Sequence, residues 1–201
     1  MRLRVRLLLL TVVVFIVSGC ATPPPSNQSN LCSIFRQYPD WYEDAVDMQQ
    51  KWGTPINVAM AIMKQESSYR HDALPPKDYV LGFIPWGRVS SAYGYAQAQD
   101  PAWADFQKHT GHGGSRSSFD DAMQFIGWYT HETQRQLGVS KWNAYGQYLA
   151  YHEGRGGYKR GTYRNKPWLM KVARKVEQQS RDYGWQLKQC RKELDNNKSW
   201  W

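Results

Sequence analysis

The sequence predicts a mainly α-helical domain of the α+β kind, with a long irregular loop or a small hairpin in its first half. Apolar residues recur at steps of three and four along most of the chain, which is the period of a helix packed on a core. Capping residues, prolines and glycines divide this pattern into segments. Residues 70–100 lack the period and are rich in Gly, Pro and aromatic residues, which is typical of a functional loop or a short hairpin.

The first two helices are expected on either side of Gly53. Asp40 is placed to cap a helix over 41–52, whose apolar residues follow the helical period, and Gly53 ends it. Thr54-Pro55 then begins a second helix with a cap residue and a proline in the first turn. Glu66 falls on the apolar stripe of this helix, near its C-terminal end. The pattern therefore predicts an ionisable group on a buried face.

Helix starts and stops also divide the second half of the chain. Asp100-Pro101 begins a short helix, and a Gly/Ser loop over 110–118 follows it. Ser118 with Asp121 forms a capping-box pattern that opens a longer helix, and Gly138 stops that helix. The remaining expected elements are a helix, a glycine-rich loop and one or two last helices: 141–152, 154–161 and the segment from Pro167.

The first twenty residues have the features of a lipoprotein export signal. Three arginines precede an apolar run over 7–17, which is shorter than the roughly 20 residues that span a bilayer but fits a signal-peptide core. The run ends in Val17-Ser18-Gly19-Cys20, which resembles a bacterial lipobox, where the cysteine is lipidated and becomes the N-terminus. An ordinary signal peptide or an uncleaved anchor is the alternative. Ala21 follows the cysteine, which implies sorting to the outer membrane, facing the periplasm.

These features predict four regions along the chain. Residues 1–19 form the signal peptide, and 20–31 a lipidated tether rich in Pro, Ser and Asn. Residues 32–194 form one folded domain, and 195–201 a short tail.

The two remaining cysteines lie at the two ends of the domain. Cys32 and Cys190 would enter an oxidising compartment, which favours a disulfide over two free buried thiols. In the chain-entropy account, closing so long a loop stabilises the fold by about 4–5 kcal/mol.

Charge and aromatic content indicate the class of ligand. The chain carries 26 Lys and Arg against 17 Asp and Glu, and the basic excess persists without the three leader arginines. Export excludes nucleic acid as the natural partner and favours the polyanions of the cell envelope, although a solvated basic face is the plainer alternative. The ten Trp and thirteen Tyr suit stacking on sugar rings, or packing in the core.

Glu66 is the candidate catalytic residue. Burying a charged carboxylate without a partner costs several kcal/mol, and no Lys or Arg shares its helical face within the predicted helix. Holding the proton is the cheaper solution, so the pKa should rise and the group should serve as a general acid near neutral pH. The alternative is a glutamate that caps a helix or pairs with a distant arginine.

Three short motifs occur in order along the chain. They are Glu66-Ser67-Ser68-Tyr69, Gly94-Tyr95-Ala96-Gln97 and Ala150-Tyr151-His152-Glu153-Gly154. Together they resemble the soluble-lytic-transglycosylase (SLT) family of the lysozyme-like superfamily, over roughly residues 55–158. Each motif alone is weak, but their order and spacing together are specific. The resemblance implies a lysozyme-like fold.

The resemblance also implies an activity. The substrate would be the glycan strand of peptidoglycan, cut between N-acetylmuramic acid and N-acetylglucosamine without a cofactor. Glu66 would protonate the glycosidic oxygen and then, as a carboxylate, take the proton of the C6 hydroxyl, which closes a 1,6-anhydro ring. Standard glycosidases instead use two carboxylates about 5–9 Å apart.

The matches to the motifs imply further site residues. Ser67 would hydrogen-bond near the catalytic glutamate, Gln97 would line the cleft, and the hydroxyl of Tyr151 would lie near the carboxyl, unless Tyr151 is a core residue. The substrate-binding candidates are Ser67, Ser68, Gly94, Tyr95, Gln97, Tyr151, His152 and Glu153. The candidates for stacking on sugars, which packing would explain equally well, are Tyr79, Trp86, Tyr93 and Tyr95.

Two departures from the family pattern leave alternatives open. Tyr95-Ala96 stands where the family has Leu-Met, and His152-Glu153 where it has Asn-Ala. Glu153 as a second carboxylate would allow hydrolysis, as in goose-type lysozymes. The other alternative is a non-catalytic lipoprotein that binds peptidoglycan. Beyond peptidoglycan and the membrane reached through Cys20, the sequence indicates no protein partner. It also predicts no metal site, since His109 and His112 fall in or beside a glycine loop.

Overall fold

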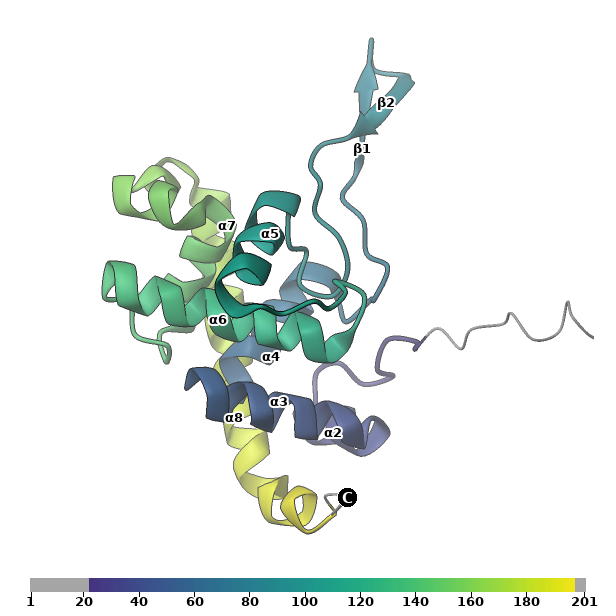
Figure 1. The fold of residues 1–201 in the computed structure, drawn as a ribbon, viewed down its shortest axis with the longest axis vertical. Helices are drawn as coiled ribbons and strands as arrows, with labels where there is room; N and C mark the ends of the chain where they lie inside the picture. Colours follow the sequence, from purple (N-terminus) through teal and green to yellow (C-terminus); the bar gives the residue numbers. More distant parts are fainter. Residues whose placement is uncertain (1–21, 198–201) are drawn as a thin grey trace, which may run out of the picture.

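The computed structural model describes residues 22–197 (Figure 1). The predicted signal peptide, Cys20 and the end of the tail lie outside these residues. The elements in chain order are α2 (Leu31–Gln37), α3 (Pro39–Trp52), α4 (Ile56–Ser67), β1 (Lys77–Val80), β2 (Ile84–Arg88), α5 (Asp100–Thr110), α6 (Phe119–Leu137), α7 (Ala144–Arg160), the 3-10 helix η1 (Thr162–Asn165) and α8 (Pro167–Asn196). The mainly α fold with a small β element is confirmed.

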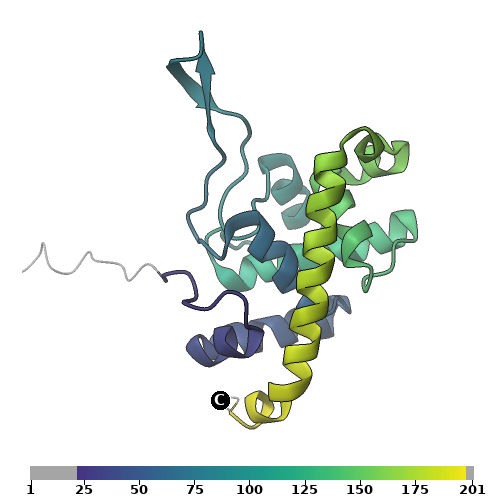
Figure 2. The same cartoon turned by 180° about the vertical axis from the view of Figure 1, so that it is seen from behind.

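Helix α8 holds the fold together. It packs on α2, α4, α7 and η1, and Figure 2 shows it running along one side of the molecule. Its buried residues recur at steps of three and four, from Leu169 through Ala173 and Val176 to Cys190 and Leu194. The segment from Pro167 is therefore a single helix of 30 residues.

Side-chain caps fix where several helices begin. The side chain of Asn30 accepts a hydrogen bond from the backbone N–H of Ser33 and starts α2, a helix that the sequence pattern did not predict. Ser118 accepts from the N–H of Asp121 and starts α6, as the capping-box pattern predicted. Gly138 ends α6 in the left-handed conformation, also as expected.

Helix α7 extends further than the sequence indicated. A loop was expected over 154–161, but the helix resumes after a break at Gly154, where φ is 72° and ψ is 155°. Only a residue without a Cβ adopts that conformation cheaply. The prediction of a loop was wrong because Gly157 is buried, and close packing against Glu153 and Thr162 offsets the poor helix propensity of glycine.

The irregular segment after α4 contains a hairpin. Strands β1 and β2 pair antiparallel, with Val80 opposite Ile84. The hairpin projects from the helical body (Figure 1), and all four residues of β1 are exposed. The expectation of a long loop or small hairpin is thus met by a hairpin on two long connecting arms.

A disulfide joins the two ends of the domain. Cys32 in α2 bonds Cys190 in α8, with 6.0 Å between the Cα atoms, as predicted. Part of the expected tether lies against the domain as well, since the Tyr38 hydroxyl donates to the carbonyl of Pro23 at 2.7 Å, and Gln28 donates to the carbonyl of Ser68 at 3.1 Å. The hydrophobic core runs from Leu31 to Leu194. No helix within 22–197 is long and apolar enough to cross a bilayer.

Candidate active site

Glu66 lies in the last turn of α4, at the edge of the core. The helix is buried on several sides, because α4 packs on α8, α6, α3 and α7. Val58 and Ile62 are fully buried, and Glu66 follows Ile62 by one turn on the same face. As a whole residue Glu66 is half-buried, and its carboxyl group is the deeply buried part. The local sequence therefore places a carboxyl group where apolar packing gives way to solvent.

The surroundings of Glu66 favour its protonated form. Burial raises its pKa to about 7, and a hydrogen bond with Tyr148 opposes part of that rise. No ion pair joins Glu66 to a Lys, Arg or His within the part of the chain that the structure describes. The carboxyl group is therefore poised to hold or release a proton near neutral pH.

Tyr148 is a site residue that the motifs did not indicate. It lies in α7, three residues before Tyr151, so the two side chains share one face of the helix. Burial raises the pKa of the Tyr148 hydroxyl well above its usual value, and the charge of Glu66 and its hydrogen bond raise it further. The Tyr148 hydroxyl therefore keeps its proton and donates to the carboxyl of Glu66. The helical period applied backwards from Tyr151 would have found it.

Tyr151 connects the second motif to the third. Its hydroxyl donates a hydrogen bond to the carbonyl of Ala96 at 2.6 Å. Its ring lies edge-on to Tyr129, with 5.0 Å between the centroids. Burial raises the pKa of Tyr151 well above its usual value, and the negative charge of Glu66 adds to the effect. Tyr151 is therefore within electrostatic reach of Glu66, while its hydroxyl is engaged by the carbonyl of Ala96.

A cleft of about 300 Å³ opens beside this group. It lies between the start of α5, the middle of α6 and the break in α7, and its walls are aromatic and polar. The lining side chains include Gln97, Gln99, Pro101, Phe125, Tyr129, Tyr151, His152 and Glu153. Glu66 does not line the cleft, but Tyr151 belongs both to its wall and to the surroundings of Glu66.

The Gly94 turn positions Gln97 in this cleft. Gly94 has a φ of 74°, and a Cβ at this position would lie 2.0 Å from the carbonyl oxygen of Arg116. The Gln97 amide donates to the carbonyls of Ala73 and Gly94 at 2.8 and 3.0 Å. These two hydrogen bonds fix the orientation of the Gln97 amide. Gln97 is among the residues that line the cleft, and Gly94 shapes the turn before it.

Glu153 is held in an ion-paired cluster. Its carboxylate accepts hydrogen bonds from Lys166 at 2.7 Å and from the hydroxyl of Thr162 and contacts His152 at 3.2 Å. Burial alone would raise the pKa of Glu153, but hydrogen bonds from Lys166, Thr162 and His152 lower it to about 2. A carboxylate so strongly stabilised is a weak base.

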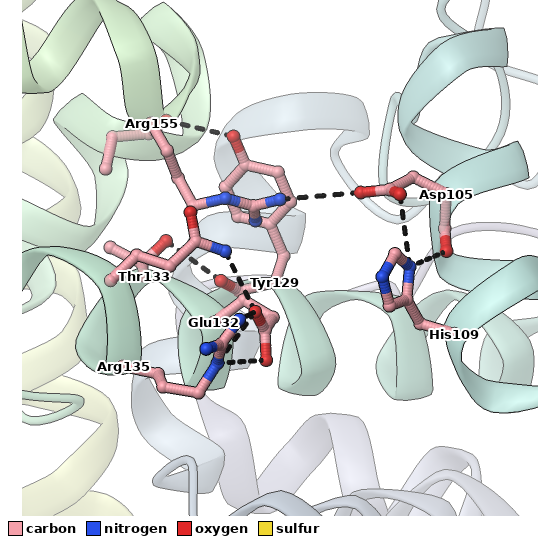
Figure 3. A network of polar contacts seen from close by, with 9 residues as sticks. Asp105, His109, Tyr129, Glu132, Thr133, Arg135 and Arg155 are labelled. Carbon is pink, nitrogen blue, oxygen red and sulfur yellow. Dashed lines mark hydrogen bonds and ion pairs between the residues drawn. The ribbon is translucent and has the colours of Figure 1, made fainter.

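A second polar network supports the wall of the cleft from α5 and α7 (Figure 3). The guanidinium of Arg155 lies 4.6 Å from the ring centroid of Tyr129 and 5.4 Å from that of Trp128. Asp105 lies 3.6 Å from the same guanidinium and 3.1 Å from His109. A cation over a ring face attracts its π electrons, so Arg155 helps to fix Tyr129 in the cleft wall.

This geometry agrees with the comparison with known families. A sequence model of the transglycosylase SLT domain matches residues 8–190. The chain belongs to the transglycosylase SLT-domain family. No curated protein and no solved structure matches it. Membership in the SLT family indicates, at the level of the family, a lytic transglycosylase that acts on peptidoglycan.

Four expected binding residues of the SLT domain do not line the cleft: Gly94, which shapes the turn before Gln97, and Ser67, Ser68 and Tyr95. The Ser67 hydroxyl donates to the carbonyl of Met63 at 3.3 Å, so it is used within α4. Ser68 is exposed and lines a separate hollow beside α8. Tyr95 is buried, and its ring lies edge-on to Trp41 and to Phe119, each 5.7 Å away. The ring of Tyr95 is therefore a packing residue and offers no open face to a sugar.

The other stacking candidates lie outside the SLT cleft too. Tyr79 and Trp86 are exposed on the projecting hairpin. Tyr93 is half-buried, and Arg116 lies 5.7 Å from its ring centroid. Phe125 and Tyr129 of α6 line the cleft instead, and no motif in the sequence indicated a role for either at the site.

His152 is on the rim of the cleft, where its ring lies edge-on to Trp168 at 5.3 Å. Between residues 22 and 197 no group of three His, Cys, Asp or Glu side chains could hold a metal ion. His112 is engaged by Asp121 at 2.5 Å, and His109 by Asp105.

Proposed function

We propose that this SLT domain cleaves the glycosidic bond between N-acetylmuramic acid and N-acetylglucosamine and leaves 1,6-anhydro ends, with Glu66 acting first as acid and then as base. The observation that carries the proposal is the environment of Glu66. Its carboxyl has a pKa of about 7, a hydroxyl donor in Tyr148 and a neighbour, Tyr151, in the wall of an open cleft.

The first step is proton transfer to the leaving sugar. Protonated Glu66 gives its proton to the glycosidic oxygen as the bond from that oxygen to C1 of muramic acid breaks. The N-acetyl carbonyl of the muramic acid stabilises the positive charge that develops at C1. Tyr148 then donates to the new carboxylate of Glu66, which limits the cost of forming a charge in this buried position.

The second step closes the ring. The Glu66 carboxylate takes the proton of the C6 hydroxyl, and O6 forms a bond to C1. The catalyst returns to its protonated state, no water is consumed, and one residue serves both steps.

The state of Glu153 supports this single-carboxylate mechanism over hydrolysis with a second carboxylate. A general base must be free to accept a proton, yet Lys166 and Thr162 occupy the oxygens of Glu153. A goose-type hydrolytic route through Glu153 would require this cluster to open.

Digestion of purified sacculi tests the proposal. We expect products one water lighter than reducing-end products, and we expect Glu66→Gln to abolish cleavage. Glu132→Gln is the comparison variant, because Glu132 is ion-paired with Arg135 and is not among the residues that line the cleft. Reducing-end products would establish hydrolysis instead, and binding without any cleavage would establish a peptidoglycan-binding lipoprotein.

We further propose that the domain is anchored to the outer membrane, facing the periplasm, through a lipid on Cys20. The lipobox-like residues 17–20 and the apolar run before them support this placement. Mass spectrometry of the mature N-terminus should show a diacylated cysteine at position 20, and Cys20→Ala should abolish that modification.

A further inference from the structure

A second groove, of about 370 Å³, lies on another side of the molecule from the cleft. It runs beside α8, the helix seen along the molecule in Figure 2, and includes the start of α4 and the loop between α6 and α7. Its lining residues are Gln49, Pro55, Asn57, Trp142, Arg181, Gly184, Trp185, Leu187, Lys188 and Arg191. Asn57 precedes Glu66 by nine residues along α4, so the groove lies roughly 14 Å from the catalytic position along the helix axis.

Two exposed indoles line this groove. Trp142 stands in the loop after α6 and is 73 % exposed, and Trp185 stands on α8 and is 67 % exposed. Neither ring contributes to the core, and no ring contact is found for either within the described chain. Two exposed indoles that line the same groove give it an apolar surface, and such a surface rimmed by polar residues is typical of a binding site. An indole face stacks on the C–H groups of a sugar, and its N–H can hydrogen-bond.

The groove is also cationic. Arg181, Lys188 and Arg191 belong to its lining, and none of its ten lining residues is acidic. Arg181 is held along α8 by Glu177 at 3.3 Å and by Gln178, and Arg191 hydrogen-bonds Tyr42, so both side chains are oriented. Fixed cations beside ring faces fit a ligand that carries both sugars and carboxylates.

The floor of the groove is built tightly. The amide of Asn57 donates to the carbonyl and hydroxyl of Ser180 at 3.0 and 2.9 Å. A Cβ at Gly184 would lie 3.3 Å from the same amide, so glycine lets α8 approach α4 closely at this point. The two helices therefore hold the groove in a fixed shape.

We infer that the groove between Trp142 and Trp185 is a second binding site for an anionic glycan, namely a peptidoglycan strand with the carboxylates of its stem peptides. This inference rests on the proposed function, since it names the same polymer as the substrate. The groove holds one strand while the cleft near Glu66 acts on another strand or on a distant part of the same one. Such a site raises the local concentration of substrate at the cleft.

Sacculus pelleting with the full chain in detergent tests the inference, with Glu66→Gln as the background to exclude cleavage. We expect Trp142→Ala with Trp185→Ala to weaken binding about fivefold or more. Lys188→Glu should weaken it as well, and more at low salt than at high salt. Lys171→Glu is the matched control, because Lys171 is exposed on α8 but lies outside the groove. Its binding should not change.

Several outcomes would overturn the inference. Unchanged sacculus binding by the double tryptophan variant would do so. A loss of binding in Lys171→Glu equal to that in Lys188→Glu would do so as well. Displacement by polyglutamate as effective as displacement by soluble peptidoglycan fragments would show a general polyanion surface instead of a glycan site. If circular dichroism shows that the double variant is unfolded, the Lys188→Glu variant tests the inference in its place. Binding by Lys188→Glu that equals the parent's at low salt would then overturn it. Pelleting needs no cleavage, so it reports on the groove even if Glu66 proves not to be catalytic.

Discussion

The hydroxyl of Tyr148 hydrogen-bonds the carboxyl group of Glu66. Burial drives the pKa of Glu66 upward, and this one donor opposes the rise by stabilising the carboxylate. Burial and the Tyr148 hydrogen bond together leave Glu66 with a pKa of about 7, so its protonated and charged forms are both populated near neutral pH. A residue that must give a proton and then recover one needs this balance.

The pH dependence of cleavage should report this balance. The first step needs protonated Glu66, so kcat/KM should be flat below about pH 6 and should fall about tenfold per pH unit well above pH 7. In Tyr148→Phe the stabilising donor is lost, so the pKa of Glu66 should rise and the falling limb should move to higher pH. Tyr145→Phe, one turn earlier in α7, is the control. If kcat/KM of Tyr148→Phe falls at the same pH as that of the parent, Tyr148 does not stabilise the Glu66 carboxylate.

Stability should depend on pH through the same carboxyl. The folded pKa of Glu66 lies above the unfolded value, so the folded state binds more protons between about pH 4 and 7, and stability falls as pH rises through that window. Glu66→Gln removes this penalty. We expect the variant to exceed the parent in unfolding free energy by about 1–3 kcal/mol at pH 8 and to lose that advantage at pH 3.

Urea denaturation at the two pH values measures the effect. Glu132→Gln is a control of opposite sign, because the hydrogen bond from Arg135 lowers the pKa of Glu132 to about 2. That variant should lose stability at pH 8. A Glu66→Gln variant no more stable than the parent at pH 8 would show that the carboxyl is not held in its neutral form.

Local sequence signals predicted the positions of several helices and the catalytic candidate. Caps such as Ser118 and stops such as Gly138 act within one turn, so they can be read without knowing the fold. The apolar stripe placed Glu66 on a packed face because burial on one helix follows its period. The environment of Glu66 then followed from the cost of burying a charge.

Contacts between distant segments could not be read in the same way. Tyr95 looked like a sugar-stacking residue by its place in a motif, but its ring packs against Trp41, which lies 54 positions earlier. Glu153 looked like a free second carboxylate, but Lys166 from the start of α8 pairs with it. Such partners depend on how helices meet, which the period of one segment does not specify.

Replacing Gly94 should cost stability. Its φ of 74° is unfavourable for residues with a Cβ, and that atom would meet the backbone oxygen of Arg116 at 2.0 Å. Backbone cannot move aside as a flexible side chain can, so we expect Gly94→Ala to lower the unfolding free energy by about 2–4 kcal/mol. Gly113→Ala is the control, because its Cβ would meet nothing within 4 Å. Chemical denaturation of the two variants checks the difference, and equal stabilities would contradict it.

The disulfide should stabilise the fold because it closes a long loop. Cys32 and Cys190 are 158 positions apart, so the bond removes much of the freedom of the unfolded chain. We expect the double variant Cys32→Ala, Cys190→Ala to lose about 2–5 kcal/mol of unfolding free energy. It should keep the pH profile of cleavage, since the bond joins α2 to the far end of α8 and touches neither Glu66 nor the cleft. Denaturation with and without a reductant measures the first effect. A parent that unfolds at the same denaturant concentration in both conditions would show that the bond contributes nothing to stability.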